Sequence, residues 1–507
     1  MDISKHLVGI KLDRQSSEPL YLQIAKVIEN KIIDNTLPPA TKLPPERELS
    51  SLFKVSRTTA INAYRWLEQQ GLVITKVGSG TYVSEPPNNS NVTTQVPWSQ
   101  LFIPYVQTPV SSILKELVSI PLDRDLISLA TGMPDPSLYP IDKFKELLNR
   151  HIDHLERSSF GYIATEGFTP LRHSVSRMLN NKGIESTWGN TMILSGSQQG
   201  LYLMGKAMLA PGDYVVVESP TYTGAIQIFQ AMGVKVLILP VSKIFPLDIL
   251  EDFLIRYRPK IFYTNPTFRN PTGDVLSEGD RRQLINLAAR HRLVVVEDDA
   301  YGDLYYGDNP PPSLKALDNY GGVVYLGTFS KVLMPGLRLG YINGHPTLIQ
   351  RLALEKQYND LHSNNISQWL MHLFLDEGHM EEHLSLIRRQ YKNRRNLMIK
   401  ALKHYFDDNI LQYETPDGGF YIWCKIQNSV TSSKLLQESL KKGVFFAPGE
   451  AFYTMPSDDK EFRLSFASNS EDTLVEGIRR LSDAFNSASK TKSQRTKTNI
   501  RLDYLIN

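Results

Sequence analysis

The sequence has a single cysteine, no long hydrophobic run and almost no excess of charge. One cysteine in 507 residues, Cys424, excludes an intramolecular disulfide framework and is typical of a protein of the reducing cytosol. No apolar stretch approaches the roughly 20 residues that a membrane-spanning helix needs. The first residues, MDISKHLVGIKLDR, are interrupted by charges too often to form a signal peptide. We therefore predict a cytoplasmic protein with no membrane partner.

The length and composition are those of a globular protein with more than one domain. A chain of 507 residues is too long for one ordinary hydrophobic core and predicts two or three domains. Hydrophobic residues make up 41% and charged residues 21% of the chain, which is typical of a soluble globular protein. The net charge of +3 permits nucleic-acid binding through a local patch but does not indicate it. Any DNA-binding function must therefore be argued from motifs.

Changes in composition divide the chain into four regions. Residues 1–84 have the pattern of three helices followed by two short strands. Residues 85–120 begin with EPPNNSNVTTQVP, a polar stretch rich in proline and asparagine that predicts a linker. Residues 121–487 alternate apolar runs with helical patterns, and residues 488–507 are polar and basic, which is typical of an unpacked tail.

Residues 121–487 predict an α/β fold. Each apolar run in this region is short, rich in β-branched residues and followed by a turn or a polar cluster. This pattern is typical of buried strands in a parallel sheet joined by helical crossovers. The runs are TMILSG, YVVVES, VKVLILP, KIFYTNP, LVVVEDD and GVVYLGT.

The stretch KLPPERELSSLFKVSRTTAINAYRWLEQQGLVITKVGSGTYV has the pattern of a winged helix-turn-helix. Ser56 suits the N-cap of the second helix of the motif, and Gly71 suits the left-handed position that ends it. Ile61, Tyr64 and Leu67 are spaced to face the core. A small helical bundle with a hairpin that serves protein contacts is the alternative interpretation.

The same stretch presents side chains where DNA would be contacted. Arg57 and Thr58 lie at the start of the second helix, and a recognition helix presents its N-terminal residues to base edges. The segment LVITKVGSGTYV predicts a hairpin, or wing, with Gly78 and Gly80 flanking its tip and Lys76 beside it. The wing would lie against phosphates or enter the minor groove.

The N-terminal region resembles the GntR family of bacterial regulators over its whole length. The residues that carry the resemblance are PLYLQIAKVIENKI, LPPERELSSLFKVSRTTAINAYRWLEQQGLV and GSGTYV. The resemblance implies that double-stranded DNA is a partner. The DNA contacts implied at matching positions are Arg47, Ser56, Arg57, Thr58, Lys76 and Gly80.

The segment GTFSKVLMPGLRLGY places Lys331 between a serine and a Pro-Gly break. A lysine in such a segment is either a surface charge beside a loop or the anchor of an aldehyde cofactor, with which it forms a Schiff base. Pyridoxal phosphate makes further demands. It needs a carboxylate at its pyridine nitrogen, donors at its phenolic oxygen, hydroxyls and an arginine at its phosphate, and an aromatic ring over its face.

Residues of all these kinds follow predicted strands. Asp298 lies in VVVEDDAY, Asn270 in the turn NPTFRNPTG, and Tyr222 follows a strand in ESPTYTG. SGSQQGLYL joins a strand to a helix start, which is a ready anion site. Arg463 lies in the apolar strand RLSFA, where an unpaired cation is costly unless a carboxylate ligand meets it. Each residue alone has an ordinary structural explanation, and their joint occurrence in this order indicates a pyridoxal phosphate site.

This set of residues resembles that of the fold-type I aminotransferases, especially the branch that acts on aminoadipate, kynurenine and aromatic amino acids. The resemblance implies a large α/β/α domain and a smaller α+β domain. At matching positions Lys331 corresponds to the Schiff-base lysine, Asp298 to the partner of the pyridine nitrogen, and Arg463 to the ligand of the substrate α-carboxylate. The adjacent Asp299 leaves the choice of carboxylate open, and the spacing to Tyr301 favours Asp298.

The same resemblance implies the remaining cofactor contacts. Tyr222 would stack on the ring, and Asn270 and Tyr301 would hold the phenolic oxygen. In this family the cofactor lies at a dimer interface, so Tyr162 is expected to reach the phosphate of the neighbouring subunit. We predict no metal site. The implied phosphate contacts are Ser197, Gln198, Thr328, Ser330 and Arg338.

The joined architecture resembles the MocR subfamily of transcriptional regulators. The resemblance implies a homodimeric DNA-binding regulator whose aminotransferase-like domain senses an amino compound or the cofactor itself. Two alternatives remain: a working aminotransferase of amino acids that carries a DNA-binding domain, and a regulator whose large domain is only a dimerisation scaffold. The complete set of site residues argues against the scaffold. It does not separate sensing from transamination, because both use the same residues.

Overall fold

The structure, a computed structural model, describes residue 7 and residues 12–14, 19–34, 36–76, 79–84, 125–155, 161–242, 244–307, 311–454 and 457–490. Contacts between Cα atoms divide the chain into two compact units, Met1–Ile103 and Pro104–Asn507. The predicted linker, residues 85–120, lies outside the described residues, and so does the tail beyond residue 490. No helix of the described part is long and apolar enough to cross a membrane.

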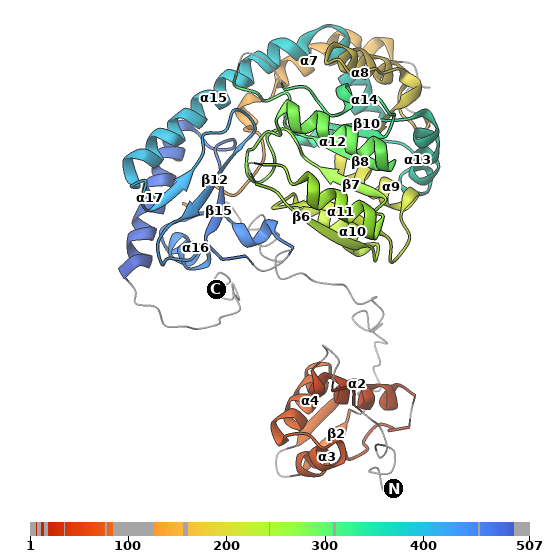
Figure 1. The fold of residues 1–507 in the computed structure, drawn as a ribbon, viewed down its shortest axis with the longest axis vertical. Coiled ribbons are helices and arrows are strands. Elements are labelled where there is room, and N and C mark those ends of the chain that lie inside the picture. Colours follow the sequence, from red (N-terminus) through yellow and green to blue (C-terminus); the bar gives the residue numbers. More distant parts are fainter. Residues whose placement is uncertain are drawn as a thin grey trace. The chain divides into compact units, whose positions relative to one another are not determined.

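In the described residues of the N-terminal unit, three helices precede a hairpin (Figure 1). Its core is formed where the apolar faces of the helices meet the inner face of the hairpin, with Ile24, Leu49, Leu67 and Val83 buried. This order confirms the predicted winged helix-turn-helix. The elements are α2 (Leu20–Ile33), α3 (Glu46–Phe53), α4 (Arg57–Gln69), β1 (Val73–Lys76) and β2 (Gly80–Val83).

Helix α4 begins and ends as its sequence predicts. The Ser56 hydroxyl accepts a hydrogen bond from the Thr59 backbone N–H at 3.1 Å, and Gly71 has a φ of +70°. Of the three predicted core residues, Ile61 is only half-buried. The buried residues of α4 are Ala60, Ala63, Tyr64 and Leu67, so the face that meets the core is turned by about one residue from the predicted one.

The wing gains a third, short edge from the segment before α3. The Val83 N–H donates to the Thr41 carbonyl at 2.8 Å, and Lys42 pairs with Tyr82. Lys76 pairs with Gly80 in the hairpin. Because side chains alternate between the faces of a sheet, Lys42, Lys76 and Tyr82 share its outer face. The predicted tip residue Gly78 lies outside the described residues.

A seven-stranded sheet of order β4-β10-β9-β8-β7-β5-β6 is the centre of the second unit (Figure 1). All six predicted strands are confirmed and run parallel to one another. The seventh strand, β10, was not predicted, and it runs antiparallel to both of its neighbours. The strands are β4 (Thr191–Leu194), β5 (Tyr214–Ser219), β6 (Lys235–Pro240), β7 (Ile261–Thr264), β8 (Val294–Asp299), β9 (Val323–Thr328) and β10 (Gly340–Asn343).

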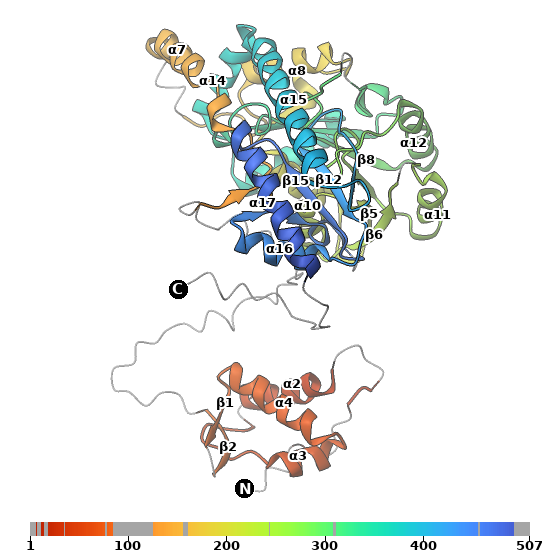
Figure 2. The ribbon, with the colours of Figure 1, turned by 90° about the vertical axis from the view of Figure 1, so that its left-hand side faces the viewer.

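Helices cover both faces of this sheet. In Figure 2 α11 and α12 lie on one side of the strands and α10 on the other. Val215 and Val217 pack into the core beneath α9, α10 and α13, whereas Val216 packs into the core beneath α11 and α12. The helices are α9 (Ser197–Met208), α10 (Thr223–Ala231), α11 (Leu247–Tyr257), α12 (Glu278–His291) and α13 (Pro346–Asn359).

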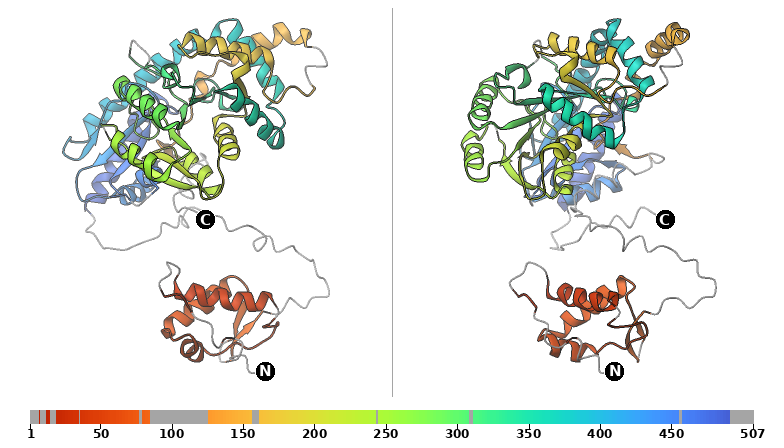
Figure 3. Two further views of the ribbon diagram at one scale, coloured as in Figure 1. Left: turned by 45° about the vertical axis from the view of Figure 1, so that its right-hand side comes forward. Right: turned by 90° about the vertical axis from the view of Figure 1, so that its right-hand side faces the viewer.

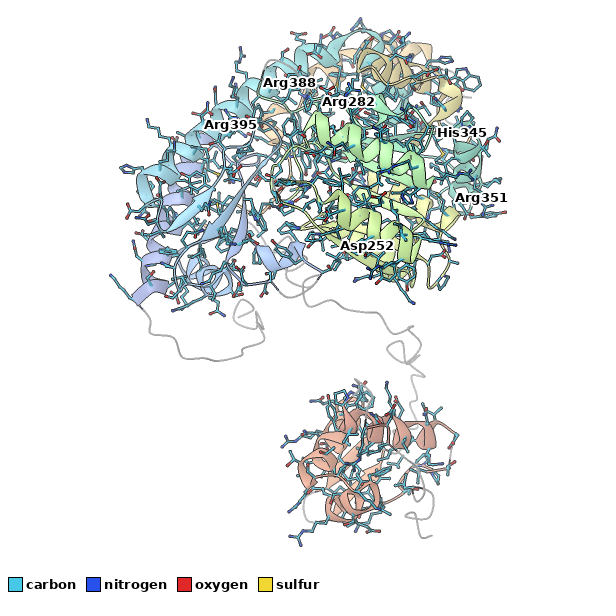
Figure 4. All side chains as sticks on the ribbon, in the orientation of Figure 1. Asp252, Arg282, His345, Arg351, Arg388 and Arg395 are labelled. Atoms are coloured by element: carbon cyan, nitrogen blue, oxygen red, sulfur yellow. The ribbon has the colours of Figure 1, made fainter. Side chains whose placement is uncertain are left out.

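The outer faces of these helices are charged. Asp252, Arg282 and Arg351 project from α11, α12 and α13 in Figure 4, and each pairs with an oppositely charged residue one turn away on its own helix. Three further helices pack beside the sheet, where α8 and α14 lie against each other (Figure 3). They are α7 (Ile141–His151), α8 (Thr169–Asn181) and α14 (Asn365–Asp376).

A smaller α+β part follows the long helix α15 (His379–Tyr405), as predicted. Its antiparallel sheet has the order β11-β12-β15-β14, and α15, α16 and α17 pack around it. Helix α17 continues to Lys490, so residues 488–490 of the predicted tail are helical. The elements are β11 (Leu411–Tyr413), β12 (Tyr421–Ile426), α16 (Ser432–Lys441), β14 (Ala447–Pro448), β15 (Glu461–Ser465) and α17 (Glu471–Lys490); β13 (Val444–Phe445) pairs with β3 (Ile127–Ser128).

Candidate functional site

A cavity of about 350 Å³ lies where the large sheet meets the smaller part. Turns that follow β4, β5, β7 and β9, together with the last residues of β8, contribute to its walls, which is where ligands bind in open α/β sheets. All predicted cofactor and substrate contacts except Tyr162 line it. They are Ser197, Gln198, Tyr222, Asn270, Asp298, Tyr301, Thr328, Ser330, Lys331, Arg338 and Arg463.

Lys331 reaches into this cavity from the turn after β9. Its Nζ atom donates a hydrogen bond to the Gly132 carbonyl at 2.7 Å and lies 5.9 Å from the centre of the Tyr301 ring. The side chain is half-buried and makes no ion pair with any residue that the structure describes. Lys331 is therefore not a surface charge, and its amine lies where a ligand in the cavity can meet it.

Asp298, near the end of β8, lines the cavity and has one carboxylate oxygen without a hydrogen-bond partner among the described residues. Its Oδ2 accepts a hydrogen bond from the Tyr263 hydroxyl at 2.8 Å, whereas its buried Oδ1 accepts none from any described residue. Burial, with a smaller contribution from the charge of Asp299, raises the pKa of Asp298 to about 6. A buried oxygen without a partner is costly, so this position suits a ligand that presents a protonated nitrogen.

Asp299 points away from Lys331. It accepts hydrogen bonds from the Gly302 N–H at 2.8 Å and from the Tyr325 hydroxyl at 2.5 Å, and it lines a different cavity. The strand alternates its faces, so only one of two adjacent carboxylates can enter the site. Of the two candidates, the geometry brings only Asp298 to the lysine.

Asn265 is a site residue that the sequence did not predict. Its Nδ2 donates to the Asp298 carbonyl, and its Oδ1 accepts a hydrogen bond from the Asn270 N–H at 2.9 Å. The loop that carries both asparagines is held by a buried ion pair in which Arg269 lies 3.0 Å from Glu218. The sequence signal for Asn265 is the TNP that ends the apolar run KIFYTNP. It was missed because TNP has the pattern of an ordinary turn and the segment NPTFRNPTG drew attention to Asn270 instead.

Tyrosines line much of the cavity. The Tyr301 hydroxyl lies 2.8 Å from that of Tyr421, and Tyr301 is buried. Tyr222 is half-buried, with its ring lying against Gly224, where a Cβ atom would come within 2.5 Å of the ring. Burial, together with the charge of Asp298, raises the pKa of Tyr222 to about 12, so this ring stays neutral.

The N-terminus of α9 and Arg338 form an anion site at the other end. The helix begins after Gly196, which has a φ of +107°, and no side chain caps it. The N–H groups of Ser197 and Gln198 are thus available to an anion, whereas that of Gln199 donates to the Gly196 carbonyl at 3.2 Å. Arg338 donates to the Ser195 carbonyl at 3.0 Å, and a Cβ atom on Gly196 would come within 3.1 Å of its guanidinium.

Two hydroxyls complete this end of the cavity. Thr328 is buried, and its Oγ1 accepts a hydrogen bond from the Ser330 N–H at 3.1 Å. Gly340 lies directly behind them, where a Cβ atom would meet the Ser197 nitrogen at 2.9 Å. Strand β10 can therefore approach the start of α9 only with a glycine at this position.

Arg463 is a buried cation that has no anionic partner among the described residues. It donates to the Asn270 Oδ1 and to the Ala130 carbonyl, each at 2.6 Å, and its Nε has no partner among the described residues. Its guanidinium lies 4.1 Å from the centre of the Tyr421 ring. No described carboxylate pairs with it. A buried guanidinium without a counter-charge is energetically unfavourable. A ligand carboxylate that paired with Arg463 would remove this cost.

Tyr162 does not reach this cavity within its own chain. Its side chain is 87% exposed, and its ring contacts that of His362 with 5.7 Å between the ring centres. The predicted contact is with the phosphate of a neighbouring subunit, and it stays a prediction.

In the N-terminal unit the predicted DNA contacts are displayed at the surface. Arg47, Arg57 and Thr58 are exposed, and Arg57 is oriented by hydrogen bonds of 3.1 and 3.2 Å to Glu46. The Ser56 hydroxyl lies 2.8 Å from that of Thr59 and also caps α4. Helix α4 thus begins with an exposed arginine that pairs with Glu46.

The outer face of the wing carries two lysines on one aromatic ring. The ammonium groups of Lys76 and Lys42 lie 5.3 and 5.7 Å from the centre of the Tyr82 ring, and the stem of Lys42 lies across Gly80. Lys42 was not predicted, because only the pairing of residues 40–43 with β2 brings it here. The two lysines together place positive charge on one face of the wing. A protein with a small net charge needs such a local patch if it is to bind DNA.

Known families match both units. Residues 124–481 match aminotransferase class I and II, and residues 20–83 match the gntR family of bacterial regulatory proteins. This chain belongs to the MocR-type regulators, which join the two. It is 33% identical over 477 residues to the HTH-type transcriptional regulator YisV of Bacillus subtilis, a match that covers 92% of this chain and 96% of YisV. The MocR-type architecture accounts for both the DNA-binding motif and the lysine cavity.

Enzymes match the second unit of this MocR-type chain. The 2-aminoadipate transaminase of Thermus thermophilus is 36% identical over 391 residues, covering 76% of this chain and 97% of the enzyme. The solved kynurenine aminotransferase of Pyrococcus horikoshii is 37% identical with a TM-score of 0.71, covering 78% and 98% of the two chains. Pyridoxal phosphate is the cofactor of this family, and the free oxygen of Asp298, the uncapped start of α9 and Lys331 fit it.

Proposed function

We propose that this protein is a DNA-binding transcriptional regulator that holds pyridoxal phosphate and senses an amino acid in the same cavity. The observation that carries the proposal is Arg463, a buried guanidinium with no described carboxylate partner, in the lysine cavity of a chain that also has a GntR domain. An α-carboxylate would satisfy that charge. The amino group of the same ligand would compete with the Lys331 amine for the aldehyde of the cofactor.

The proposed roles of the cofactor contacts follow from their chemistry. Pyridoxal phosphate supplies an aldehyde that reacts with amines and a ring that withdraws electrons. Lys331 anchors it, Asp298 holds the proton of the pyridine nitrogen, and Tyr222 covers the ring. Asn270 and Tyr301 hold the phenolic oxygen. The phosphate is held by Ser197, Gln198, Thr328, Ser330 and Arg338.

The proposed DNA interface has a reading part and a positioning part. Arg57 and Thr58, at the start of α4, reach base edges, and Arg47 lies beside them at the start of α3. The wing contacts phosphates through Lys76 and Gly80, and we add Lys42 to this set because it shares the Tyr82 ring with Lys76. The Ser56 contact is compatible with its capping role, since a hydroxyl can both donate and accept.

We further propose that the protein works in the cytoplasm as a homodimer. In this arrangement Tyr162 contacts the phosphate bound by the neighbouring subunit, which accounts for the high exposure of its side chain. Residues 85–120 serve as the linker between the two units. The amino acid would act by shifting the protein between two states that differ in DNA affinity.

Catalytic transamination is the second candidate function. It is favoured by the completeness of the site, because Lys331, Asp298 and Arg463 all face one cavity. A lysine amine released from the cofactor is suited to moving a proton on a bound amino acid. Sensing and catalysis differ in the result of ligand binding, which is a change in DNA affinity for a sensor and release of a keto acid for an enzyme.

One experiment separates the two candidates. The full-length holoprotein is titrated with a panel of amino acids, with and without DNA from upstream of its own gene, while visible absorbance and DNA affinity are measured. Release of the keto acid derived from each amino acid is measured with a second α-keto acid present as the amino-group acceptor, which steady turnover requires. A sensor changes its absorbance and its DNA affinity without steady keto-acid release. Steady release with unchanged DNA affinity would establish the enzyme instead. Lys331→Ala is the control, since it should lose the absorbance of the bound cofactor in either case.

A further inference from the structure

The turn at the start of α9 is held by hydrogen bonds to Asp360, a residue that does not line the cavity. Ser195 and Gln199 stand on either side of the uncapped residues of this turn, and both donate to the Oδ2 atom of Asp360, at 2.9 and 2.8 Å. The Ser195 N–H also donates to the Gln199 Oε1 at 2.8 Å, which closes the turn on itself. One carboxylate, in the loop that follows α13, is therefore connected to both ends of the turn.

Asp360 is in turn held by a buried lysine. The Lys356 Nζ donates to the Asp360 Oδ1 at 2.6 Å, and the side chain of Lys356 is fully buried and makes no other ion pair with the described residues. Burial raises the pKa of Asp360, but hydrogen bonds from Lys356 and Gln199 outweigh this and hold its pKa below the usual value. Asp360 is therefore ionised and accepts hydrogen bonds through both oxygens.

Ser195 extends this network to the arginine of the anion site. Its carbonyl accepts the hydrogen bond from Arg338 at 3.0 Å, while its hydroxyl donates to Asp360. Asp360 does not line the cavity, so it cannot touch a ligand there. It can act only by fixing Ser195 and Gln199, and through them the direction of the first N–H groups of α9.

We infer that Asp360 is a positioning residue for the phosphate-binding turn of the cofactor site. The inference rests on the proposed function, in which Ser197, Gln198 and Arg338 hold the phosphate. A phosphate dianion is bound by several donors at once, and each contributes fully only when its direction is fixed before binding. The carboxylate of Asp360 supplies that restraint from behind the turn.

A purely structural role is the alternative, because Asp360 also ends α13, where its N–H donates to the Lys356 carbonyl at 3.0 Å. A structural role predicts that substitution weakens folding and weakens every ligand of the cavity alike. A positioning role predicts a loss confined to ligands that carry a phosphate. Pyridoxal separates the two, since it has the ring and the aldehyde of pyridoxal phosphate but no phosphate group.

The test compares the affinities of the two compounds in the full-length protein freed of cofactor. Dissociation constants for pyridoxal phosphate and pyridoxal are measured by absorbance titration for the wild type and for Asp360→Asn. We expect the dissociation constant of pyridoxal phosphate to rise about tenfold and that of pyridoxal to change less than about twofold. Asp376→Asn, an identical change in a half-exposed carboxylate that pairs with Arg177, is the control and should alter neither.

Ser195→Ala keeps the test decisive if Asp360→Asn does not fold. It removes one link to the turn and leaves the ion pair of Lys356 and Asp360 intact, and the same selective loss is expected. Equal weakening of both compounds, or no weakening in a folded variant, overturns the inference. A wild-type protein that binds pyridoxal as tightly as pyridoxal phosphate would instead overturn the phosphate site of the proposed function, which is a distinguishable result.

Discussion

The hydrogen bond between Tyr263 and Asp298 occupies only one of the two carboxylate oxygens. The Tyr263 hydroxyl lies 2.8 Å from Oδ2, and the buried Oδ1 has no partner in the described structure. Tyr263 is itself buried at the end of β7, so it fixes the plane of the carboxylate. Asp298 lines the cavity that also contains Lys331, so its free oxygen is the atom left for a ligand there.

The first prediction concerns which of two adjacent carboxylates holds the cofactor. Asp298→Ala should weaken pyridoxal phosphate binding by about 100-fold, since a buried charge-assisted hydrogen bond is lost, whereas Asp299→Ala should weaken it far less. The measurement is an absorbance titration of cofactor-free protein. Asp299 is a matched control, because it has the same side chain and is also at the end of β8. The reverse order of effects would exchange the two roles.

The second prediction concerns the pH dependence of stability without cofactor. The pKa of Asp298 is about 6 in the folded protein against an ordinary 3.8, so the folded state binds more protons than the unfolded state between these values. The contribution of Asp298 to the free energy of unfolding is therefore fully present below pH 3.8 and is lost as the pH rises to about 6. Asp298→Asn, which stays neutral, should escape this loss.

The size of that effect is set by the shift of the pKa. A difference of about two pKa units corresponds to about 3 kcal/mol, so the variant should gain up to that much over the wild type between about pH 4 and 7. Urea unfolding of the aminotransferase unit at several pH values measures the gain. A difference between variant and wild type that is constant with pH would show that Asp298 does not titrate in this range.

The sequence predicted those parts of the site that depend on local pattern. Lys331, Asn270 and Asp298 each follow or end an apolar strand, and parallel strands bring their carboxyl ends to one edge. Their mutual proximity therefore follows from the strand pattern alone. A different argument placed Arg463, because a cation in a buried strand needs a partner.

The sequence could not predict contacts that depend on pairing between distant segments. Asp360 reaches Ser195 only because α13 packs against α9, and Lys42 reaches the wing only because residues 40–43 pair with β2. Strand β10 was missed because four residues, GYIN, carry no periodicity that separates a strand from a loop. These features are set by tertiary packing, which no local pattern contains.

The third prediction concerns recognition of the ligand carboxylate. Arg463→Lys keeps the charge but loses the planar fork, so affinity for amino acids should fall by about 30-fold or more. Cofactor binding should be retained, because Asn270 is the only proposed cofactor contact to which Arg463 donates a hydrogen bond. Spectral titration of the holoprotein measures both. The matched ligand control is the amine that lacks the carboxylate, whose affinity should not change; an equal loss for the amine would contradict this role.

The fourth prediction concerns DNA recognition by α4. Arg57→Ala should reduce binding to the specific operator by about 10- to 100-fold, since an arginine that reads bases contributes about 1–3 kcal/mol of discrimination. The ion pair with Glu46 is largely exposed, so its loss should leave folding unchanged. Gel-shift titration against the upstream DNA, at one fixed salt concentration, measures the affinity.

The control for this prediction lies on the same helix. Arg65 is an exposed arginine two turns beyond Arg57, away from the helix start that enters a groove, and Arg65→Ala should leave operator affinity within about twofold of the wild type. Both variants should keep the visible absorbance of the cofactor, because neither touches the aminotransferase cavity. Equal losses for Arg57→Ala and Arg65→Ala would mean that α4 contributes only diffuse charge, and base reading would then have to come from another element.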